Sequence, residues 1–427
     1  MRTPILGVPI DNLSRNQILV KIKEFLQNKG QNLITTPNPE ILVDSEQDWF
    51  FKEIFYRSSL NIADGFGLIL ASLFLYGKKI SRFPGSDLML GICKIAQMEN
   101  KSIYLLGASK KVVEETAKKL VKLYPHLRIA GANPGLKIEF SQNDKNKRIW
   151  HNEFLTGLSF NRKENQKIIN DINQVKPDLL FVAFGHLKQE KWLVSFLSQM
   201  PSVKIAVGVG GAFDYISGVA LRAPKLARVI GLEWLWRLFT NPRYRTQRVF
   251  KATIIFLRLI WEYKKILKKK FRRGVAGFIV NNSGQFFIAK RTPEHFDFYS
   301  LYTEQWQPPQ GGVEPGESLE RAVIREIEEE TGFKTSVLCE AKKPYFYERT
   351  TNSAKKSRFK KYRGVEKYIF LLKYDGDGLE INLDKQELCD YKWVSLEELK
   401  RIIHPLRRRS LEILLEDCSC RLPAQIK

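Results

Sequence analysis

Long apolar runs are missing from this chain of 427 residues. No uncharged apolar segment approaches the roughly 20 residues that a helix needs to span a bilayer, so the pattern argues against a membrane-spanning protein. Residues 1–15 lack the basic start and the long apolar core of a secretory signal peptide. We therefore expect a cytoplasmic protein.

Cysteine is also scarce, with five residues scattered along the chain. No two pairs of cysteines have the spacing of zinc ligands, which argues against a structural zinc site. Because cytosolic thiols are kept reduced, we expect free structural cysteines. Internal repeats and low-complexity blocks are absent from the sequence as well.

Positive charge is what the sequence has in excess. Lys and Arg number 70 against 46 Asp and Glu, which gives a formal net charge of +24 and a pI near 9.7. Such an excess predicts an anionic partner: nucleic acid, a membrane surface or a phosphorylated substrate. The length of the chain suggests two or three domains.

Strand-like and helix-like segments alternate up to about residue 240. Apolar, β-branched runs at 32–37, 102–107 and 179–185 end in Gly or Pro, and helical patterns such as 110–125 and 187–200 lie between them. This alternation predicts an α/β domain with a mainly parallel sheet covered by helices. In such sheets ligands bind at the carboxyl ends of the strands, so polar residues there are site candidates.

Residues 244–271 form a strongly basic segment. Apolar residues recur at helical spacing, and Lys or Arg recurs every seven residues on another side, which predicts a basic amphipathic helix. Three interpretations stay open from the pattern alone. The helix packs on its own domain with a solvated basic face, lies on an anionic membrane surface, or binds nucleic acid.

A separate α+β unit is expected over 272–427, with a hairpin at its start, an acidic helix after it and a single C-terminal helix over 395–418. Glu326, Glu329 and Glu330 are spaced i, i+3 and i+4, so they project from one face of the acidic helix. Like charges repel there unless a cation compensates. A hard divalent cation with oxygen ligands is therefore predicted, and Mg2+ is usual where the substrate carries phosphates.

The residue order around this helix resembles the Nudix box. The box positions outside the three glutamates are Gly311, Glu317, Arg325 and Gly332. The resemblance implies the Nudix fold, a mixed sheet between helices, and Mg2+- or Mn2+-dependent hydrolysis of a nucleoside diphosphate linked to another moiety. It implies that Glu326, Glu329 and Glu330 are metal ligands, and we count Glu329 among the catalytic residues too.

The segment 306–312, WQPPQGG, resembles the Nudix branch of RNA pyrophosphohydrolases and dinucleoside-polyphosphate hydrolases. Gln310 and Arg272 match substrate-side positions of that branch, and Glu387 matches a further acidic ligand or base. The Gln/Lys/Trp pattern of its RNA-processing members is missing around Gly364. The substrate therefore stays open among a nucleoside polyphosphate such as Ap4A, an RNA 5′ end and a nucleotide sugar.

Polar and glycine residues follow the predicted strands of the first half. They are Thr36, Asn38, Asp64, Arg82, Gln189, Glu190, Gly210 and Gly211. These segments, together with GLEWLWR at 231–237 and PRYR at 242–245, resemble the WecG/TagA/CpsF family, glycosyltransferase family 26, over about residues 3–250. One departure is Leu187, where the family usually has proline.

This second resemblance implies a Rossmann-like glycosyltransferase that needs no metal. Such enzymes move N-acetylmannosamine or a related sugar from a UDP-sugar to a polyprenyl-diphosphate-linked sugar in cell-surface polysaccharide synthesis, and inversion is favoured. Asp64 would be the general base for the acceptor hydroxyl if burial raises its pKa. The remaining matched residues would bind substrate: Thr36, Asn38 and Arg82 on the sugar and acceptor side, Gln189, Glu190, Gly210 and Gly211 on the nucleotide side, and Arg237, Arg243 and Arg245 at the lipid diphosphate.

The sequence as a whole predicts a transferase domain at 1–243, a basic linker helix at 244–271 and a Nudix domain at 272–427. A lipid-linked acceptor favours the membrane-surface interpretation of the helix, so we expect a bifunctional enzyme peripheral to the inner face of a bacterial membrane. The alternative is a Nudix hydrolase, acting on RNA 5′ ends or Ap4A, with an inactive transferase-like binding module. A third interpretation makes both domains nucleotide sensors. The donor sugar and the oligomeric state are not predicted.

Overall fold

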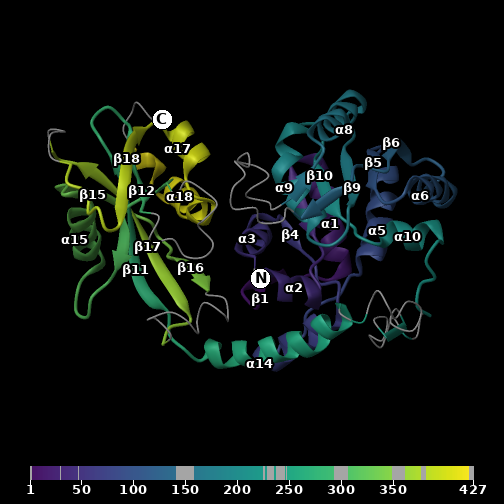
Figure 1. Cartoon of the computed structure of the whole chain (residues 1–427), viewed down its shortest axis with the longest axis horizontal. Helices are drawn as coiled ribbons and strands as arrows, with labels where there is room; N and C mark the ends of the chain where they lie inside the picture. Colours follow the sequence, from purple (N-terminus) through teal and green to yellow (C-terminus); the bar gives the residue numbers. More distant parts are fainter. Residues whose placement is uncertain are drawn as a thin grey trace. The chain divides into compact units, whose positions relative to one another are not determined.

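The computed structural model describes residues 2–28, 30–46, 48–140, 158–224, 227, 235–236, 246, 248–292, 306–348, 361–376 and 381–422. The chain divides into two compact units, Met1–Lys264 and Lys265–Lys427 (Figure 1). Among the described residues, no helix combines the length and the apolar character needed to cross a membrane.

The first unit is built on a parallel sheet with the strand order β4-β3-β10-β9-β5-β6. The strands of the unit are β1 (Arg2–Ile5), β2 (Val8–Asp11), β3 (Asn32–Thr35), β4 (Leu60–Asn61), β5 (Ser102–Gly107), β6 (Arg128–Asn133), β7 (Ile138–Phe140), β8 (Leu158–Phe160), β9 (Leu179–Ala183) and β10 (Ile205–Gly208). β5, β9 and β10 are buried along their whole length, as expected for strands covered on both faces. The predicted parallel α/β architecture is confirmed.

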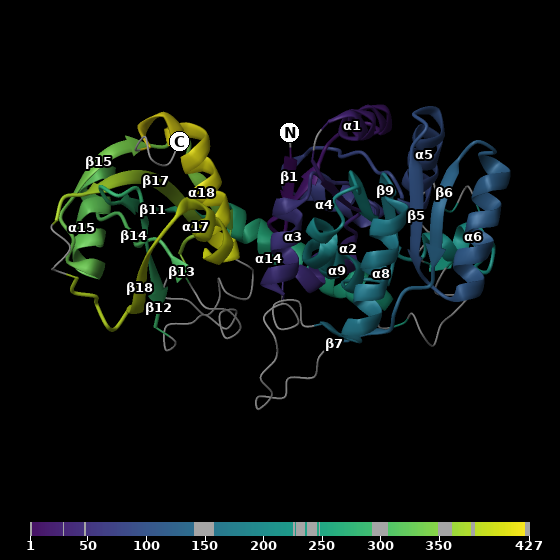
Figure 2. The same cartoon turned by 90° about the horizontal axis from the view of Figure 1, so that it is seen from above.

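Helices pack on both faces of this sheet (Figure 2). They are α1 (Arg15–Gln27), α2 (Pro39–Ser45), α3 (Trp49–Arg57), α4 (Phe66–Tyr76), α5 (Gly85–Met98), α6 (Lys110–Leu123), α8 (Arg162–Val175), α9 (Lys188–Phe196) and α10 (Ala212–Ser217). α1, α5, α6 and α10 share one hydrophobic core with the strands, whereas α9 packs on β3, β9 and β10. α1 begins at a capping box between Ser14 and Gln17, and α2 begins at the N-cap Asn38.

The basic segment is helical from residue 248, with a π-helical turn at Lys251–Ile255 followed by α14 (Phe256–Leu267). α14 crosses the boundary between the two units. Phe256, Ile260 and Tyr263 are buried on the first unit, and the backbone N–H of Gly7 donates a hydrogen bond to the Tyr263 hydroxyl over 3.3 Å. The helix therefore packs on its own domain.

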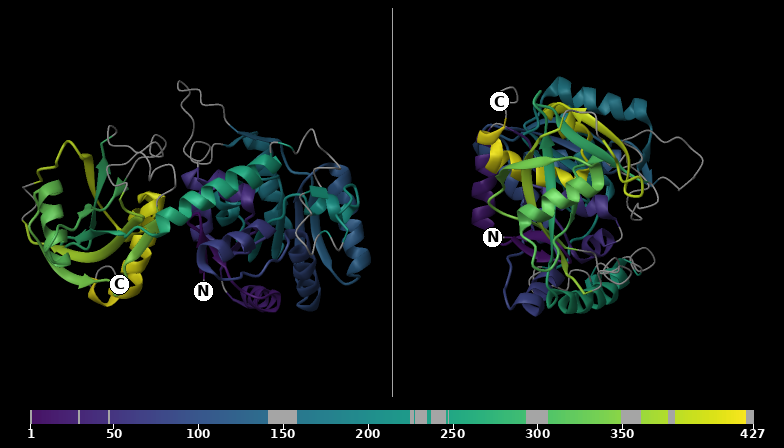
Figure 3. Two further views of the ribbon diagram at one scale, coloured as in Figure 1. Left: turned by 90° about the horizontal axis from the view of Figure 1, so that it is seen from below. Right: turned by 90° about the vertical axis from the view of Figure 1, so that its left-hand side faces the viewer.

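The second unit is a mixed sheet between helices (Figures 1 and 3). Its strands are β11 (Arg272–Val280), β12 (Phe286–Arg291), β13 (Trp306–Gln307), β14 (Gln310–Gly312), β15 (Thr335–Glu340), β16 (Tyr345–Glu348), β17 (Gly364–Tyr374) and β18 (Leu388–Val394). β11 pairs in parallel with β17, and the predicted hairpin joins β11 to β12. α15 (Leu319–Thr331) packs on one face of the sheet, and α17 (Leu396–Ile402) and α18 (Pro405–Cys418) pack on the other.

Alternation along β17 explains these two layers. Ile369 and Leu371 face the core shared with α17 and α18, whereas Phe370 and Leu372 face the core shared with α15. Successive side chains of a strand point to opposite faces, so an uninterrupted apolar run fills both cores.

Two predictions for this unit are wrong. The expected single C-terminal helix is broken between Ile402 and Pro405, because proline has no N–H to donate and disfavours a helical conformation in the residue before it. The expectation that all cysteines are free fails too, because a disulfide links Cys339 of β15 to Cys418 of α18. The two cysteines are separated by 79 positions in the sequence, so no local sequence motif predicts that they pair.

Candidate active sites

The first candidate site lies at the carboxyl ends of β3, β4, β9 and β10. Asp64 follows β4 and is half-buried. Its backbone N–H donates to the carbonyl of Pro37 over 3.0 Å, and its Oδ1 accepts the N–H of Gly85, the first residue of α5, over 3.3 Å. Arg82 Nε donates to the Asp64 carbonyl over 2.5 Å. The Asp64 carboxylate is thus held at the start of a helix, and the Arg82 guanidinium binds the backbone carbonyl of the same residue.

Gln189 organises the neighbouring edge of the same site. Its Oε1 accepts the Gly210 N–H over 2.9 Å, and its Nε2 donates to Glu190 Oε1 over 2.8 Å. A Cβ on Gly208 would lie 2.7 Å from Gln189 Nε2, so a glycine is needed for this close approach. Thr36 Oγ1 lies 3.5 Å from the Gly208 carbonyl. Gln189 thus contacts Gly210 just after β10, and Thr36 after β3 contacts Gly208 at the end of β10.

Glu190 is almost completely buried, with 1% of its surface exposed. Burial raises the pKa of its carboxyl above the usual value. Its Oε2 has no hydrogen-bond partner among the described atoms. An unpaired buried carboxyl oxygen is costly to keep, which is typical of a residue retained for a reason other than stability.

Leu187, at the position of the family's proline, has a positive φ of 68°. It is the N-cap residue of α9 and directly precedes Lys188, whose Nζ donates to the Ile138 carbonyl over 2.5 Å. Asn38 caps α2 by accepting the Ile41 N–H over 3.0 Å. The predicted residues Arg237, Arg243 and Arg245 lie outside the described residues.

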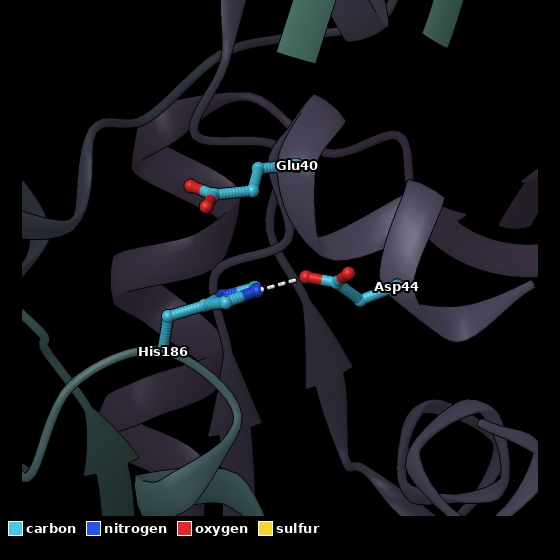
Figure 4. Close-up of side chains that lie close together, drawn as sticks. All are labelled: Glu40, Asp44 and His186. Carbon is cyan, nitrogen blue, oxygen red and sulfur yellow. Dashed lines mark hydrogen bonds and ion pairs between the residues drawn. The ribbon is translucent and has the colours of Figure 1, made fainter. Parts of the chain in front are cut away.

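A charged cluster missed by sequence analysis lies next to this site. Glu40 and Asp44 of α2 and His186 of the loop after β9 offer ligand atoms within 4.8 Å of one another (Figure 4). His186 Nε2 lies 2.5 Å from Asp44 Oδ2. Both carboxylates also bind cations of the basic segment, since Arg248 pairs with Glu40 in a bidentate contact at 2.8–3.2 Å and Lys251 pairs with Asp44 at 2.6 Å. The cluster therefore attaches that segment to α2.

The second candidate site lies between β14 and α15. A Cβ on Gly311 would lie 1.7 Å from Glu326 Oε2, and a Cβ on Gly312 would lie 2.0 Å from Arg272 Nη2. The two glycines thus let a carboxylate and a guanidinium pack directly on the backbone of β14. Glu326 Oε1 also accepts the Gly312 N–H over 2.9 Å.

Arg325 holds the loop before α15 in place. Its Nε and Nη2 donate to the two oxygens of Glu317 over 2.9 and 3.0 Å, and Nη2 also donates to the Gly312 carbonyl over 3.0 Å. Its Nη1 contacts Glu326 at 3.2 Å and Glu329 at 3.0 Å. α15 ends at Gly332, which adopts a left-handed φ of 74° as C-cap.

Glu330 is the most buried carboxylate of this site. It is 6% exposed, and burial together with the nearby charges of Glu387 and Glu326 raises its pKa well above the usual value. Its Oε2 accepts the Gln310 N–H over 3.2 Å. Burial also raises the pKa of Glu326. A bound cation would relieve this repulsion, and an all-carboxylate donor set fits Mg2+ or Mn2+. Among the described residues, these carboxylates do not form a group whose ligand atoms all lie within 4.8 Å of one another, and Glu329 is paired with Arg325.

Lys367 of β17 is a site residue that sequence analysis missed. It is 6% exposed, and its Nζ donates to Gln310 Oε1 over 3.1 Å and to the Val275 carbonyl over 3.3 Å. Burial, with the neighbouring charge of Arg407, lowers its pKa to about 7. The apolar residues around it in β17 mark an ordinary core strand, so only the fold reveals a cation aimed at the carboxylate site.

Comparisons with known proteins identify two families, one in each half of the chain. The profile of the glycosyl transferase WecG/TagA/CpsF family matches residues 3–270, and that of the NUDIX domain matches residues 270–414. An N-acetylglucosaminyldiphosphoundecaprenol N-acetyl-beta-D-mannosaminyltransferase of Staphylococcus aureus is 31% identical over 270 residues, which cover 63% of this chain and 95% of that protein.

Solved structures similar to part of the chain include a MutT protein from Methanosarcina mazei, which is 27% identical with a TM-score of 0.25 and covers 34% of this chain and 93% of its own. Another is an Ap4A hydrolase of C. elegans, 20% identical with a TM-score of 0.26, which covers 34% of this chain and 96% of its own.

Proposed function

The chain belongs to the WecG/TagA/CpsF glycosyltransferase family and carries a Nudix hydrolase domain behind it, and from this we propose that it is a bifunctional enzyme. The first domain would transfer N-acetylmannosamine or a related sugar from UDP to a sugar on a polyprenyl diphosphate. The second would hydrolyse a nucleoside polyphosphate with Mg2+.

Asp64 supports the transferase proposal most directly. It stands at the carboxyl edge of the sheet beside Arg82 and the start of α5, within the same edge as Gln189 and Thr36. In the proposed step Asp64 accepts the proton of the acceptor hydroxyl while that oxygen bonds to the anomeric carbon of the donor. The bond from that carbon to the UDP oxygen breaks, and UDP leaves with the electron pair.

The transferase is tested by release of UDP from UDP-N-acetylmannosamine in the presence of a lipid-linked acceptor. Asp64→Asn should abolish release, because an amide cannot take the proton. Asp375→Asn, an exposed change in the second unit, serves as the matched control and should release UDP at the wild-type rate. If neither wild type nor Asp64→Asn releases UDP from any UDP-sugar of a panel, the transferase proposal is refuted and a binding module is favoured.

For the Nudix domain, the support is the buried carboxyl of Glu330 and the half-buried carboxyl of Glu326, which lie near the basic side chains of Lys367 and Arg272. A bound Mg2+ would supply charge for the phosphate oxygens and orient water. The chain itself would hold the cation with Glu326, Glu329 and Glu330, and would contact the phosphates with Lys367 and Arg272. Glu329 must leave Arg325 to join this ligand set.

The hydrolase is tested with Ap4A, triphosphorylated RNA and nucleotide sugars. Glu329→Gln should remove Mg2+-dependent phosphate release, whereas Glu328→Gln, exposed on another face of α15, should retain it. Release that survives Glu329→Gln at the wild-type rate would refute the assigned ligand. The preferred substrate of the panel decides between the RNA, dinucleotide and nucleotide-sugar classes.

We also propose that the protein works at the inner face of the membrane. A lipid-linked acceptor resides in the bilayer, and the segment 248–267 combines Lys and Arg with exposed apolar residues such as Trp261. Co-sedimentation of the full chain with anionic vesicles tests this, and recovery in the supernatant at low salt would contradict it.

A further inference from the structure

A cavity of about 350 Å³ lies beside the first candidate site, at the N-terminal end of α1. Its lining residues are Ser14, Arg15, Ile69, Lys79, Ile80, Ser81 and Arg82. Three of them are cationic, and no carboxylate belongs to this lining set. The two serines add hydroxyl donors. Such a lining is complementary to an anion of high charge.

One lining residue, Arg82, links the cavity to the backbone of Asp64, which does not itself belong to the lining. Arg82 lines it and donates to the Asp64 carbonyl over 2.5 Å. Arg15 Nε lies 3.4 Å from the Arg82 carbonyl, and its guanidinium packs over the Phe83 ring at 5.2 Å. A ligand that binds Arg82 in the cavity would therefore be separated from the backbone of Asp64, the proposed base, by a single side chain.

An apolar surface on α4 adjoins the cavity. Ile69 lines the cavity, and Leu73 stands one turn further along the same helix face. Leu70, Leu73 and Phe74 are 50%, 42% and 46% exposed, although all three are large apolar side chains. Exposed apolar groups gathered in this way mark an interaction site.

α14 extends this surface. Its Phe256 lies 3.6 Å from the position of a Cβ on Gly67, and Lys264 Nζ lies 3.8 Å above the Phe74 ring. The two helices therefore run side by side in the same direction. Leu257 and Trp261 of α14 are 59% and 56% exposed. We call the five exposed residues of the two helices, Leu70, Leu73, Phe74, Leu257 and Trp261, the α4–α14 surface.

We propose that the cavity binds the diphosphate of the lipid-linked acceptor and that the α4–α14 surface lies in the membrane interface around its polyprenyl chain. This inference rests on the proposed transferase function, and it assigns the diphosphate to Arg15, Lys79 and Arg82 in place of the predicted Arg237, Arg243 and Arg245. The chemistry of the two regions matches the two halves of such a lipid, since a cationic cavity takes the diphosphate and an apolar face bordered by Lys264 suits the interface. In this proposal Asp64 acts on the sugar attached to that diphosphate.

The first test measures binding without catalysis. The full chain is floated with phosphatidylcholine vesicles that contain or lack a small share of a polyprenyl diphosphate. Wild type should float more with the diphosphate lipid, and inorganic pyrophosphate should reduce this excess. The double variant Arg15→Glu/Lys79→Glu should lose the excess only, whereas Leu73→Glu/Phe74→Glu should lose flotation on both vesicles. Arg128→Glu, in a cavity at the amino ends of β5 and β6, is the control and should behave as wild type.

The second test measures kinetics. Arg15→Glu/Lys79→Glu should raise the KM for the lipid-linked acceptor by roughly tenfold or more and leave the KM for the UDP-sugar unchanged, because two charged contacts are lost at one substrate only. An equal rise of both KM values, or flotation and acceptor KM equal to wild type, would overturn the inference.

The two proposals fail separately. If wild type binds diphosphate vesicles through Arg15 and Lys79 but transfers no sugar, the proposed transferase activity is refuted, whereas diphosphate binding in the cavity is supported. If it transfers sugar and the double variant is indistinguishable from wild type in both tests, the cavity assignment fails and the transferase stands. Circular dichroism of each variant shows that it is folded.

Discussion

Glu190 offers a test of the first site that combines stability and function. Its carboxyl is buried, its pKa is raised above the usual 4.5, and Oε2 has no partner. In the unfolded chain the group ionises near its ordinary pKa, whereas in the folded protein it keeps its proton to higher pH. Folded protein thus binds one more proton in this window, and wild-type stability falls as pH rises from about 4.5. The slope for one proton is about 1.4 kcal/mol per pH unit.

The perturbation is Glu190→Gln, which keeps the shape and cannot ionise. Its free energy of unfolding relative to wild type should grow by about 1.4 kcal/mol per pH unit above pH 4.5, until the folded-state pKa is passed and the difference becomes constant. Sugar transfer should fall at the same time, since the residue lies in the proposed nucleotide-sugar site. A stabilised and less active variant is the expected result of a strained site.

Urea unfolding of both proteins over pH 4.5 to 8 measures this difference, because other titrating groups cancel. Glu115→Gln is the control: this exposed carboxyl pairs with Lys118, which lowers its pKa, so it should show no gain of stability with rising pH. A Glu190→Gln difference that is flat with pH would refute the idea that burial holds the proton. A variant less stable than wild type at pH 8 would refute it as well.

Three further outcomes are expected. Gly311→Ala places a Cβ 1.7 Å from Glu326 Oε2, so hydrolysis should fall by roughly a hundredfold or more while sugar transfer is retained; unchanged hydrolysis would contradict the close packing. Mg2+ at a hundred times its Kd should stabilise the second unit by about 2.7 kcal/mol, seen as a higher Tm, and Glu330→Gln should remove most of this gain; an equal gain in the variant would show that Glu330 is not a ligand. Cys339→Ser opens a link across 79 residues and should destabilise the second unit by about 2–4 kcal/mol in urea unfolding under oxidising conditions; identical midpoints would contradict the disulfide.

Much of this architecture could be predicted because its signals are local. The parallel sheet follows from apolar runs such as 179–183, and α15 follows from a cap at Ser318 and a glycine at its end. Contacts between distant segments could not be predicted. Arg248 and Glu40 are 208 residues apart, and neither differs in the sequence from any solvated charge. The same reason conceals the Cys339–Cys418 link.

Lys367 shows a different limit. The charge is visible in the sequence, but its direction is decided by strand register, because a shift of one residue would point it to the opposite face. The break before Pro405, in contrast, was open to prediction, since proline is a strong helix breaker. The apolar residues on both sides of Pro405 have helical spacing, which favoured the prediction of one continuous helix. In the structure the proline decides, and the helix is interrupted.

The positive φ of Leu187 has a consequence for protein engineering. Replacing a residue by the one most common among relatives usually stabilises a protein. Here the residue that the family resemblance implies is proline, whose ring fixes φ near −65°, whereas Leu187 has φ of 68°. Leu187→Pro therefore requires the whole turn to change with it.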